Sequence, residues 1–382
     1  MVKGRLKKVF PGGNTCKGFH SYYNYIIEPD ATRIIIIKGG PGVGKSTFMR
    51  TIGEEMLACG FDVEFHCCSS DNGSLDGVKI PAIGVALIDG TAPHIVDPKH
   101  PGAVDEIIHL GDYWDEAKMR ANKDNIVRAT AKVSRLFQVA YSHLAEAKVA
   151  RDEIRNYIDG AVNKAQLNKL TQELIRDVLD GVPPQYRHFP KARHLFASAV
   201  SPQGVVHYME TLLADLKKVY VLKGLPGRYQ AKILARLTDA AEMRGLDTEV
   251  YHCAMEPEEI ELLVVPALEA AFLKYSEEIG FDASGLEGVN VTVLDLYQYI
   301  DHRALDPFIP AMMEAQQRFR SSLNRAVRYI AEAKLTHDYL ESFYVPAMDF
   351  KAIERKRDET LQRILRWAEE IQVGRLPRVS AG

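Results

Sequence analysis

Short apolar runs alternate with turn residues along this 382-residue chain. Arg33–Lys38 is a β-branched run, which is typical of a strand buried on both faces. Residues 45–59 follow with the apolar spacing of a helix, and Gly60 is placed to cap its C-terminus. Residues 62–67 and 83–89 are predicted as further strands. This strand–helix–strand order predicts parallel pairing with right-handed crossovers.

Long charged stretches with helical spacing follow these strands. They cover residues 116–158, 166–179, 310–343 and 350–370, and apolar positions recur in them with heptad-like spacing. We expect each pair to form a helical hairpin that packs on its own domain. An arm for dimerisation or for a protein partner is the alternative, so a homo-oligomer formed through these helices stays open.

The chain contains an internal repeat. Residues 33–83 align with residues 218–268 at a constant offset of 185, without a gap. Residues 181–185, with the sequence GVPPQ, suit a connector because neither proline can extend a helix. The repeat predicts two tandem α/β domains, at residues 1–187 and 188–382.

The strongest chemical signal is the segment GGPGVGKST at residues 39–47, between the first strand and the first helix. It fits the phosphate-loop pattern at Gly39, Gly44, Lys45 and Ser46. Glycines let the backbone N–H groups wrap a phosphate, and the helix N-terminus favours the anion. We expect Lys45 to reach the β and γ phosphates from a solvent-facing position, and the Ser46 hydroxyl to ligate Mg²⁺. The predicted nucleotide-binding residues are Gly39, Gly40, Pro41, Gly42, Val43, Gly44, Lys45, Ser46 and Thr47.

A phosphate-loop enzyme also needs an acid for its magnesium shell. Asp89 ends the apolar strand at 83–89 and is predicted for this role, with a turn-forming aspartate as the alternative. Asp71 lies in the loop 69–77, which leaves the end of the second strand and can bind a phosphoryl acceptor, orient water or ligate a metal. A polar, solvated loop is the competing interpretation. The predicted catalytic residues are therefore Lys45, Asp89 and Asp71, and the predicted metal ligands are Ser46 and Asp89.

Other polar residues give weaker signals. His94 can act as a base or phosphate sensor, although a structural role is equally expected. Arg120, Arg128 and Arg135 are candidates for a lid arginine by proximity alone.

The matching loop of the second repeat is degenerate. Tyr229 replaces the second essential glycine, Gln230 the lysine and Ala231 the hydroxyl ligand. We therefore expect the second repeat to fold like the first without binding nucleotide. Arg228 could act on the first site, but an exposed loop arginine is favoured.

These motifs resemble those of a family of bacterial P-loop proteins regarded as ATPase-like or nucleotide-kinase-like. The resemblance is carried by residues 38–47, by HCCSSDNGSLDG at 66–77, and by DGTAPHIVDP at 89–98 followed by PGAV at 101–104. It implies nucleotide binding and little more. Together with the repeat and the helical stretches, the motifs predict two tandem P-loop NTPase-like domains with parallel sheets, each with a long helical hairpin extension.

Composition narrows the function classes. Forty-eight basic and fifty-one acidic residues give a net charge of −3, which provides no clear nucleic-acid signal. No run approaches the roughly 18 apolar residues of a membrane span, and the basic N-terminus is not followed by a secretory apolar segment. Five scattered cysteines suit neither a disulfide framework nor a zinc site. A cytoplasmic protein is expected.

The leading functional hypothesis is a Mg²⁺-dependent ATPase with one active nucleotide site in the N-terminal half. A kinase acting on a nucleotide or small metabolite is the first alternative, and its acceptor is unknown. A nucleotide-sensing scaffold with negligible turnover is the second. GTP is disfavoured because Asn122-Lys123-Asp124-Asn125 misses the last position of the guanine signature N-K-x-D.

Overall fold

The computed structural model describes the chain except for residues 1–2, 30, 93–94, 186–188, 225–227 and 374–382. The described residues form two compact units. The first holds the residues up to Gly12, Ser21–Gln138 and the residues from Tyr329 onward. The second holds Gly13–His20 and Val139–Arg328. The predicted boundary between residues 187 and 188 lies outside the described residues.

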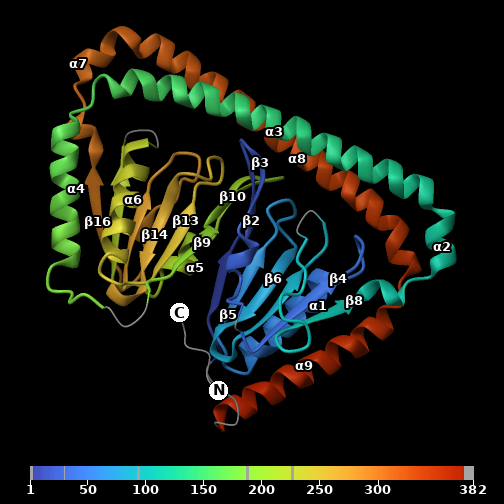
Figure 1. Cartoon of the computed structure of the whole chain (residues 1–382). Helices are drawn as coiled ribbons and strands as arrows, with labels where there is room; N and C mark the ends of the chain where they lie inside the picture. The colour runs from blue at the N-terminus through green and yellow to red at the C-terminus, as the bar shows by residue number, and fades with distance from the viewer. Residues whose placement is uncertain (1–2, 30, 93–94, 186–188, 225–227, 374–382) are drawn as a thin grey trace. The chain divides into compact units, whose positions relative to one another are not determined.

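The first unit is built on a six-stranded sheet with the order β1-β5-β6-β7-β4-β8 (Figure 1). Its strands are β1 Leu6–Val9, β4 Arg33–Lys38, β5 Val63–Cys67, β6 Leu75–Ile80, β7 Val85–Asp89 and β8 Asp105–His109. The pairs β1–β5, β4–β7 and β4–β8 are parallel, as predicted.

The prediction of a purely parallel sheet is wrong, because β6 runs antiparallel to both β5 and β7. The sequence suggested a polar loop over residues 69–77, yet Leu75, Asp76 and Gly77 belong to this buried strand. A strand between two neighbours is stabilised by its ladder and its packing, which a polar local sequence does not reveal. The sheet is therefore mixed.

Helix α1, Lys45–Ala58, covers one face of this sheet and packs mainly on β6. Gly53 lets α1 come close to Phe65 and Val78, since a β-carbon there would overlap the ring of Phe65. After the C-cap residue Cys59, Gly60 adopts a φ of 89°, so the predicted glycine cap is confirmed.

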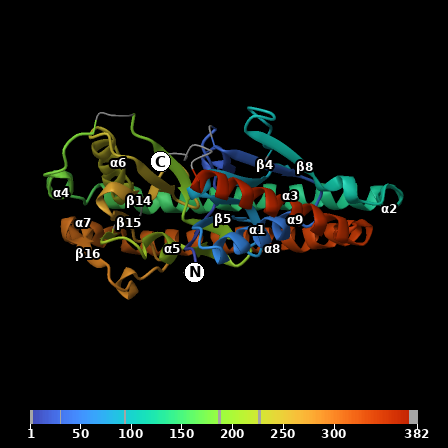
Figure 2. The same ribbon diagram turned by 90° about the horizontal axis from the view of Figure 1, so that it is seen from below.

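The outer side of α1 contacts α9, Phe350–Gln372, which comes from the other end of the chain (Figure 2). Arg363 on α9 holds Glu106 of β8 with a 2.5 Å hydrogen bond. Arg363 and Arg33 also lie over the ring of Trp367. These contacts fasten the C-terminal helix to the first sheet.

The second unit contains a six-stranded mixed sheet with the order β16-β12-β15-β14-β13-β9. Its strands are β9 Ala192–Phe196, β12 Lys218–Lys223, β13 Thr248–His252, β14 Ile260–Val265, β15 Ala270–Lys274 and β16 Asn290–Asp295. Read from β9, this is the strand order of the first sheet. Strands β13, β14 and β15 lie 185 residues after β5, β6 and β7, and β14 is again the antiparallel strand.

Helices complete the second unit. Helix α6, Arg228–Glu242, packs on β14, and α4, Lys164–Leu179, packs on α6. The short helices α5 and α7 span Met209–Leu213 and His302–Leu305. A core of Leu234, Leu237, Leu263 and Phe272 lies between α6 and the sheet.

Two small antiparallel ribbons accompany the sheets: β2 Gly12–Thr15 with β3 Gly18–Ser21, and β10 Ser198–Ser201 with β11 Gly204–His207. Within the second unit, the Asn14 side chain donates a 3.0 Å hydrogen bond to the carbonyl of Val200. This bond ties part of the N-terminal ribbon to the second unit.

The prediction of helical hairpins packed on their own domains is also wrong. Residues 116–158 form the short helix α2, Glu116–Ala121, and one long helix α3, Lys123–Asp159. The helix that follows α3 is α4, and it packs on α6 in the second unit. The equivalent long helix α8, Ile309–Tyr344, leads to α9, which packs in the first unit.

The long helices run alongside each other within each unit (Figure 1). In the first unit Lys132 of α3 pairs with Glu332 of α8, and in the second Arg318 of α8 pairs with Glu153 of α3. Of the helices in the described part of the chain, none is long and apolar enough to cross a membrane.

Candidate functional site

The loop between β4 and α1 has the backbone that the glycine pattern predicts. Gly42 and Gly44 have φ angles of 65° and 88°, which side chains with a β-carbon rarely adopt. Gly44 is the N-cap of α1 and provides no side-chain acceptor, so the first N–H groups of the helix stay directed at the loop. Val43 is fully buried and anchors the loop.

Lys45 lies at the centre of this loop. Its ammonium donates hydrogen bonds to the carbonyls of Gly39, at 3.2 Å, and Gly40, at 2.8 Å. It also lies 3.6 Å from the Asp89 carboxylate. Only 11% of the Lys45 side chain is exposed, so the expectation of a solvent-facing lysine is wrong. The two carbonyls and the Asp89 carboxylate therefore hold the ammonium against the loop.

Asp89 ends β7, directly beside the strand that leads into the loop, since Ile37 and Asp89 are partners in the β4–β7 register. Its Oδ1 accepts a 2.9 Å hydrogen bond from the backbone N–H of Thr91. Burial raises the pKa of the Asp89 carboxyl above its usual value, while Lys45 and Thr91 act in the opposite direction. The Thr91 hydroxyl donates to the Gly39 carbonyl at 3.0 Å and joins this turn to the loop.

Ser46 points its hydroxyl toward the start of β6. Its Oγ accepts a 2.9 Å hydrogen bond from the Leu75 N–H and keeps its own proton and one lone pair. Thr47, the last predicted binding residue, is exposed on α1. The structure therefore brings Lys45, Ser46 and Asp89 to one edge of the sheet.

Asp76 is a residue of this edge that the sequence did not single out for catalysis. It is 5% exposed on β6, and its neighbours include Asp89, Lys45, Tyr23 and Cys68. Burial, with a contribution from the Asp89 charge, raises the pKa of the Asp76 carboxyl to about 7. A carboxyl with this pKa can accept or donate a proton near neutral pH. In the sequence, Asp76 is one of two acids in the polar segment 69–77, and nothing there distinguishes it from Asp71.

Asp71 lies further out, in the turn before β6. Its carboxylate accepts hydrogen bonds from the Gly73 N–H at 3.1 Å and from the Ser74 hydroxyl at 2.9 Å. Lys334 of α8 lies 3.4 Å from the same carboxylate. These contacts give Asp71 a structural role in shaping the turn and linking it to α8.

The C-terminal end of α8 covers the glycine loop. Tyr344 packs against Gly40, where a β-carbon would overlap its ring, and Glu341 packs against Gly42. Gly40 therefore allows a close approach of this helix. Sequence reasoning could not identify these residues, because they lie some three hundred positions from the loop.

His337, Asp338 and Glu341 on α8 are close enough together to hold a cation. However, Lys334 pairs with Asp338, and a ring nitrogen of His337 lies 3.5 Å from a carboxylate oxygen of Glu341, so these groups already have partners on α8.

The candidate lid arginines lie on α2 and α3, and two of them bond to residues of their own helix. In the described part of the chain Arg120 pairs with Glu116 and Arg128 bonds to Asn125, while Arg135 is exposed on α3. His94 lies outside the described residues.

The equivalent edge of the second unit has different chemistry. Gln230, at the position of Lys45, is buried and donates to the carbonyls of Leu222 and Tyr275. Lys274 occupies the position of Asp89 at the end of β15. Arg228 bonds to Asp159 at 2.9 Å, a contact within the second unit.

Comparisons with protein-family models, curated proteins and solved structures found no match to this chain. The resemblance to bacterial P-loop proteins therefore remains an expectation that rests on the motifs themselves.

Replacement of Asp76 by asparagine is expected to change the pH dependence of stability. The pKa of the carboxyl is about 7 in the folded chain, against an ordinary value of 3.8. The folded state therefore keeps a proton that the unfolded state loses, and the parent's stability falls as pH rises from about 4 to 7. Asparagine does not ionise, so Asp76→Asn should gain unfolding free energy relative to the parent over this range, by at most about 4 kcal/mol. Urea denaturation of both proteins at several pH values measures this difference, and a pH-independent difference would contradict it.

Proposed function

We propose that the first unit binds ATP with Mg²⁺ and hydrolyses it at the edge formed by β4, β6 and β7. The observation that carries the proposal is the glycine loop between a buried strand and a helix N-terminus, with Lys45 3.6 Å from Asp89. The positive φ of Gly42 and Gly44 supports a loop that presents backbone N–H groups to an anion.

The residues at this edge fit a magnesium ion. Mg²⁺ prefers hard oxygen ligands and usually keeps several waters, and here the Ser46 hydroxyl and the Asp89 carboxylate supply oxygens from adjacent elements. When bound with nucleotide, the ion would neutralise phosphate charge. The contact between Lys45 and Asp89 does not conflict with this, because the ammonium of a phosphate-loop lysine can also bind a phosphate oxygen.

The side chains have separable roles in the proposed reaction. The N–H groups at the start of α1 bind phosphate oxygens, and Lys45 supplies a cation that already lies against the glycine loop. Asp76 can accept a proton from the attacking water, since its pKa near 7 leaves much of it ionised at neutral pH. Burial of this edge strengthens each of these electrostatic contacts.

A kinase is the second candidate, because the same base can take the proton of an acceptor hydroxyl. It is favoured by the polar turn that precedes Asp76 in the chain, where Asp71, Ser74 and Lys334 of α8 contact one another and offer hydrogen-bonding groups to an acceptor. ATP consumption that rises sharply with one metabolite would identify this reaction.

Adenine is favoured over guanine in the proposal. Residues 122–125 would form the guanine-reading loop, but Asn122 ends α2 and its amide donates to the Lys118 carbonyl. Lys123 then begins α3. Residues 122–125 therefore form the junction between α2 and α3 and not a loop that could read guanine.

Titration of Mg²⁺ and ATP into the whole chain should give one site per chain. Gln230 is neutral and engaged with two carbonyls, Lys274 replaces the acid, and Ala231 offers no oxygen for a metal. Calorimetry measures the stoichiometry, and Lys45→Ala should weaken the binding without exposing a second site. A stoichiometry of two, or a second bound ATP that persists in Lys45→Ala, would show that the second unit also binds nucleotide.

A further inference from the structure

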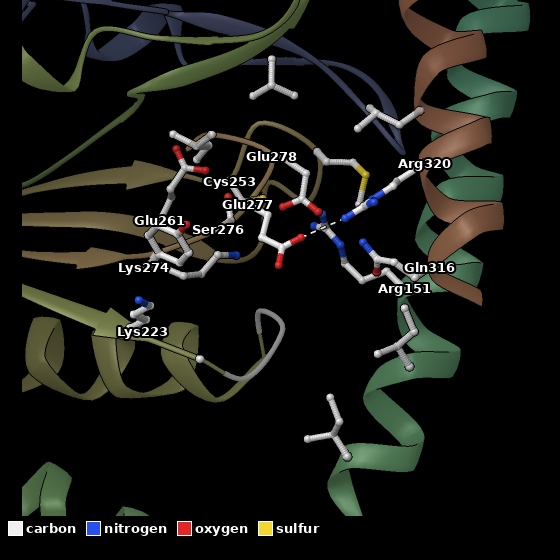
Figure 3. A pocket seen from close by; sticks show the side chains of 18 of the residues that line it. Arg151, Lys223, Cys253, Glu261, Lys274, Ser276, Glu277, Glu278, Gln316 and Arg320 are labelled. Carbon is white, nitrogen blue, oxygen red and sulfur yellow. Dashed lines mark hydrogen bonds and ion pairs between the residues drawn. The ribbon is translucent and has the colours of Figure 1, made fainter. Parts of the chain in front are cut away.

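The second unit contains a cavity of about 520 Å³, within the range of small-molecule sites. It opens at the carboxyl ends of β12 and β15, where Lys223 and Lys274 end their strands. In open α/β sheets this edge is where ligands bind. Figure 3 shows the charged side chains of the sheet facing those of α3 and α8 across the cavity.

One wall of the cavity is polar and carries deeply buried groups. Lys274 is 3% exposed and pairs with Glu259 at 3.1 Å. Glu261 is 2% exposed and accepts a 2.5 Å hydrogen bond from the Ser198 hydroxyl through one of its two oxygens. Burying such groups costs free energy, and nothing in the packing of an apolar core requires them here.

The charges that line the cavity do not cancel. Glu278 pairs with Arg151 at 3.3 Å, and Glu277 pairs with Arg320 at 3.1 Å. Lys223, by contrast, has no carboxylate within ion-pair distance among the described residues, and its ammonium lies 5.8 Å from the centre of the Tyr275 ring. Burial raises the pKa of Glu261 to about 7, so its negative charge is only partial at neutral pH. The remaining charge at the sheet edge is therefore positive.

The opposite wall, formed by α3 and α8, also has an apolar part beside Arg151 and Arg320. Ile154 and Ile158 of α3 and Met312 and Leu323 of α8 line it, and Tyr297 adds an aromatic face. An occupant that satisfies both walls carries an anionic group at one end and an apolar or aromatic body at the other.

Among its described residues, this edge of the second unit lacks the groups that would bind a magnesium nucleotide in the first unit. The two edges share one strand order, but Lys274 stands where Asp89 would ligate the metal, and Gln230 stands where Lys45 would meet phosphate. A cation at the strand end binds an anionic group directly, without a metal ion.

We propose that this cavity is a second ligand site, which binds a small organic anion with an apolar body through Lys223 and Lys274. The anionic group is a carboxylate or a phosphate monoester, and both have the same chemistry toward the two ammonium groups. This site is independent of the nucleotide proposed for the first unit.

Calorimetric titration of the full chain with 3-phenylpropionate and with phenyl phosphate tests the proposal. We expect at least one of them to bind saturably at one site per chain, and the one that binds identifies the head group. The neutral 3-phenylpropionamide should bind at least about tenfold more weakly than the carboxylate, because a charge-assisted contact is lost. If neither anion binds below about 10 mM, or if the amide binds as tightly as the better anion, the proposal is wrong.

Three variants locate the binding. Lys223→Ala changes an exposed side chain, so the fold should persist while anion affinity falls about tenfold. Ser276→Trp should fill the cavity and block binding, with circular dichroism as the check on folding. Lys45→Ala should leave anion affinity within about twofold. Unchanged affinity in Lys223→Ala, or loss of anion binding in Lys45→Ala, would overturn the assignment to this cavity.

Discussion

Lys45→Ala is expected to weaken ATP binding by about 10- to 150-fold, the equivalent of 1.5–3 kcal/mol for a charged hydrogen bond. The side chain supplies the cation nearest to the glycine loop, at 2.8 Å from the Gly40 carbonyl. When ATP binds, the Lys45 ammonium would contact a charged phosphate oxygen instead of the Gly40 carbonyl. The substitution therefore destabilises the ATP complex more than the free protein. Isothermal titration with Mg²⁺ and ATP measures the change.

The same substitution is expected to cost stability, which the sequence did not suggest. Because the Lys45 side chain is only 11% exposed, its removal leaves the nearby Asp89 carboxylate without its cation. A cost of about 1–3 kcal/mol is expected for such a loss. Lys45→Met keeps the packing of the side-chain stem and tests whether weak ATP binding follows from charge or from unfolding.

Gln230→Ala provides a matched control in the second unit. Gln230 is buried at the helix position equivalent to Lys45 and donates to two backbone carbonyls. Its removal should destabilise the chain by a similar amount and leave ATP affinity unchanged. If Lys45→Ala and Lys45→Met both bind ATP as the parent does, the phosphate-loop assignment fails.

The parts of the fold that could be predicted are those whose signal is local. The run Arg33–Lys38 forms strand β4, between β7 and β8, because its branched side chains are buried on both faces. The glycines of the loop and Gly60 were identifiable because their backbone angles exclude most other residues. The repeat also predicted the strands β12 and β13 of the second sheet.

The parts that could not be predicted depend on packing between distant segments. The segment before and into strand β6 is polar in sequence, so its pattern predicts a loop at Asp76, whereas the strand is buried because β5 and β7 flank it. Lys334 and Tyr344 look like any other positions of a long amphipathic helix. Their contacts with Asp71 and Gly40 arise from α8 and α9 packing on the first unit, which no local pattern encodes.

Asp89→Asn is expected to lower ATP turnover by about 10²- to 10³-fold while ATP still binds. The substitution keeps the size of the side chain and an oxygen that can accept the Thr91 N–H, but it removes the negative charge beside Lys45. That charge would organise Mg²⁺, whereas the phosphate cradle is made by the loop backbone and Lys45. Steady-state phosphate release measures turnover, and calorimetry measures ATP affinity in the same preparations.

Asp71→Asn and Asp76→Asn separate the roles of the three carboxylates. Asp71 shapes the turn before β6 through Gly73 and Ser74, so its amide variant should retain most of the turnover. Asp76→Asn should lower turnover because it removes the proposed base, and it should keep the magnesium dependence that Asp89→Asn weakens. A fully active Asp89→Asn together with an inactive Asp71→Asn would move the metal-organising role from the end of β7 to the turn before β6.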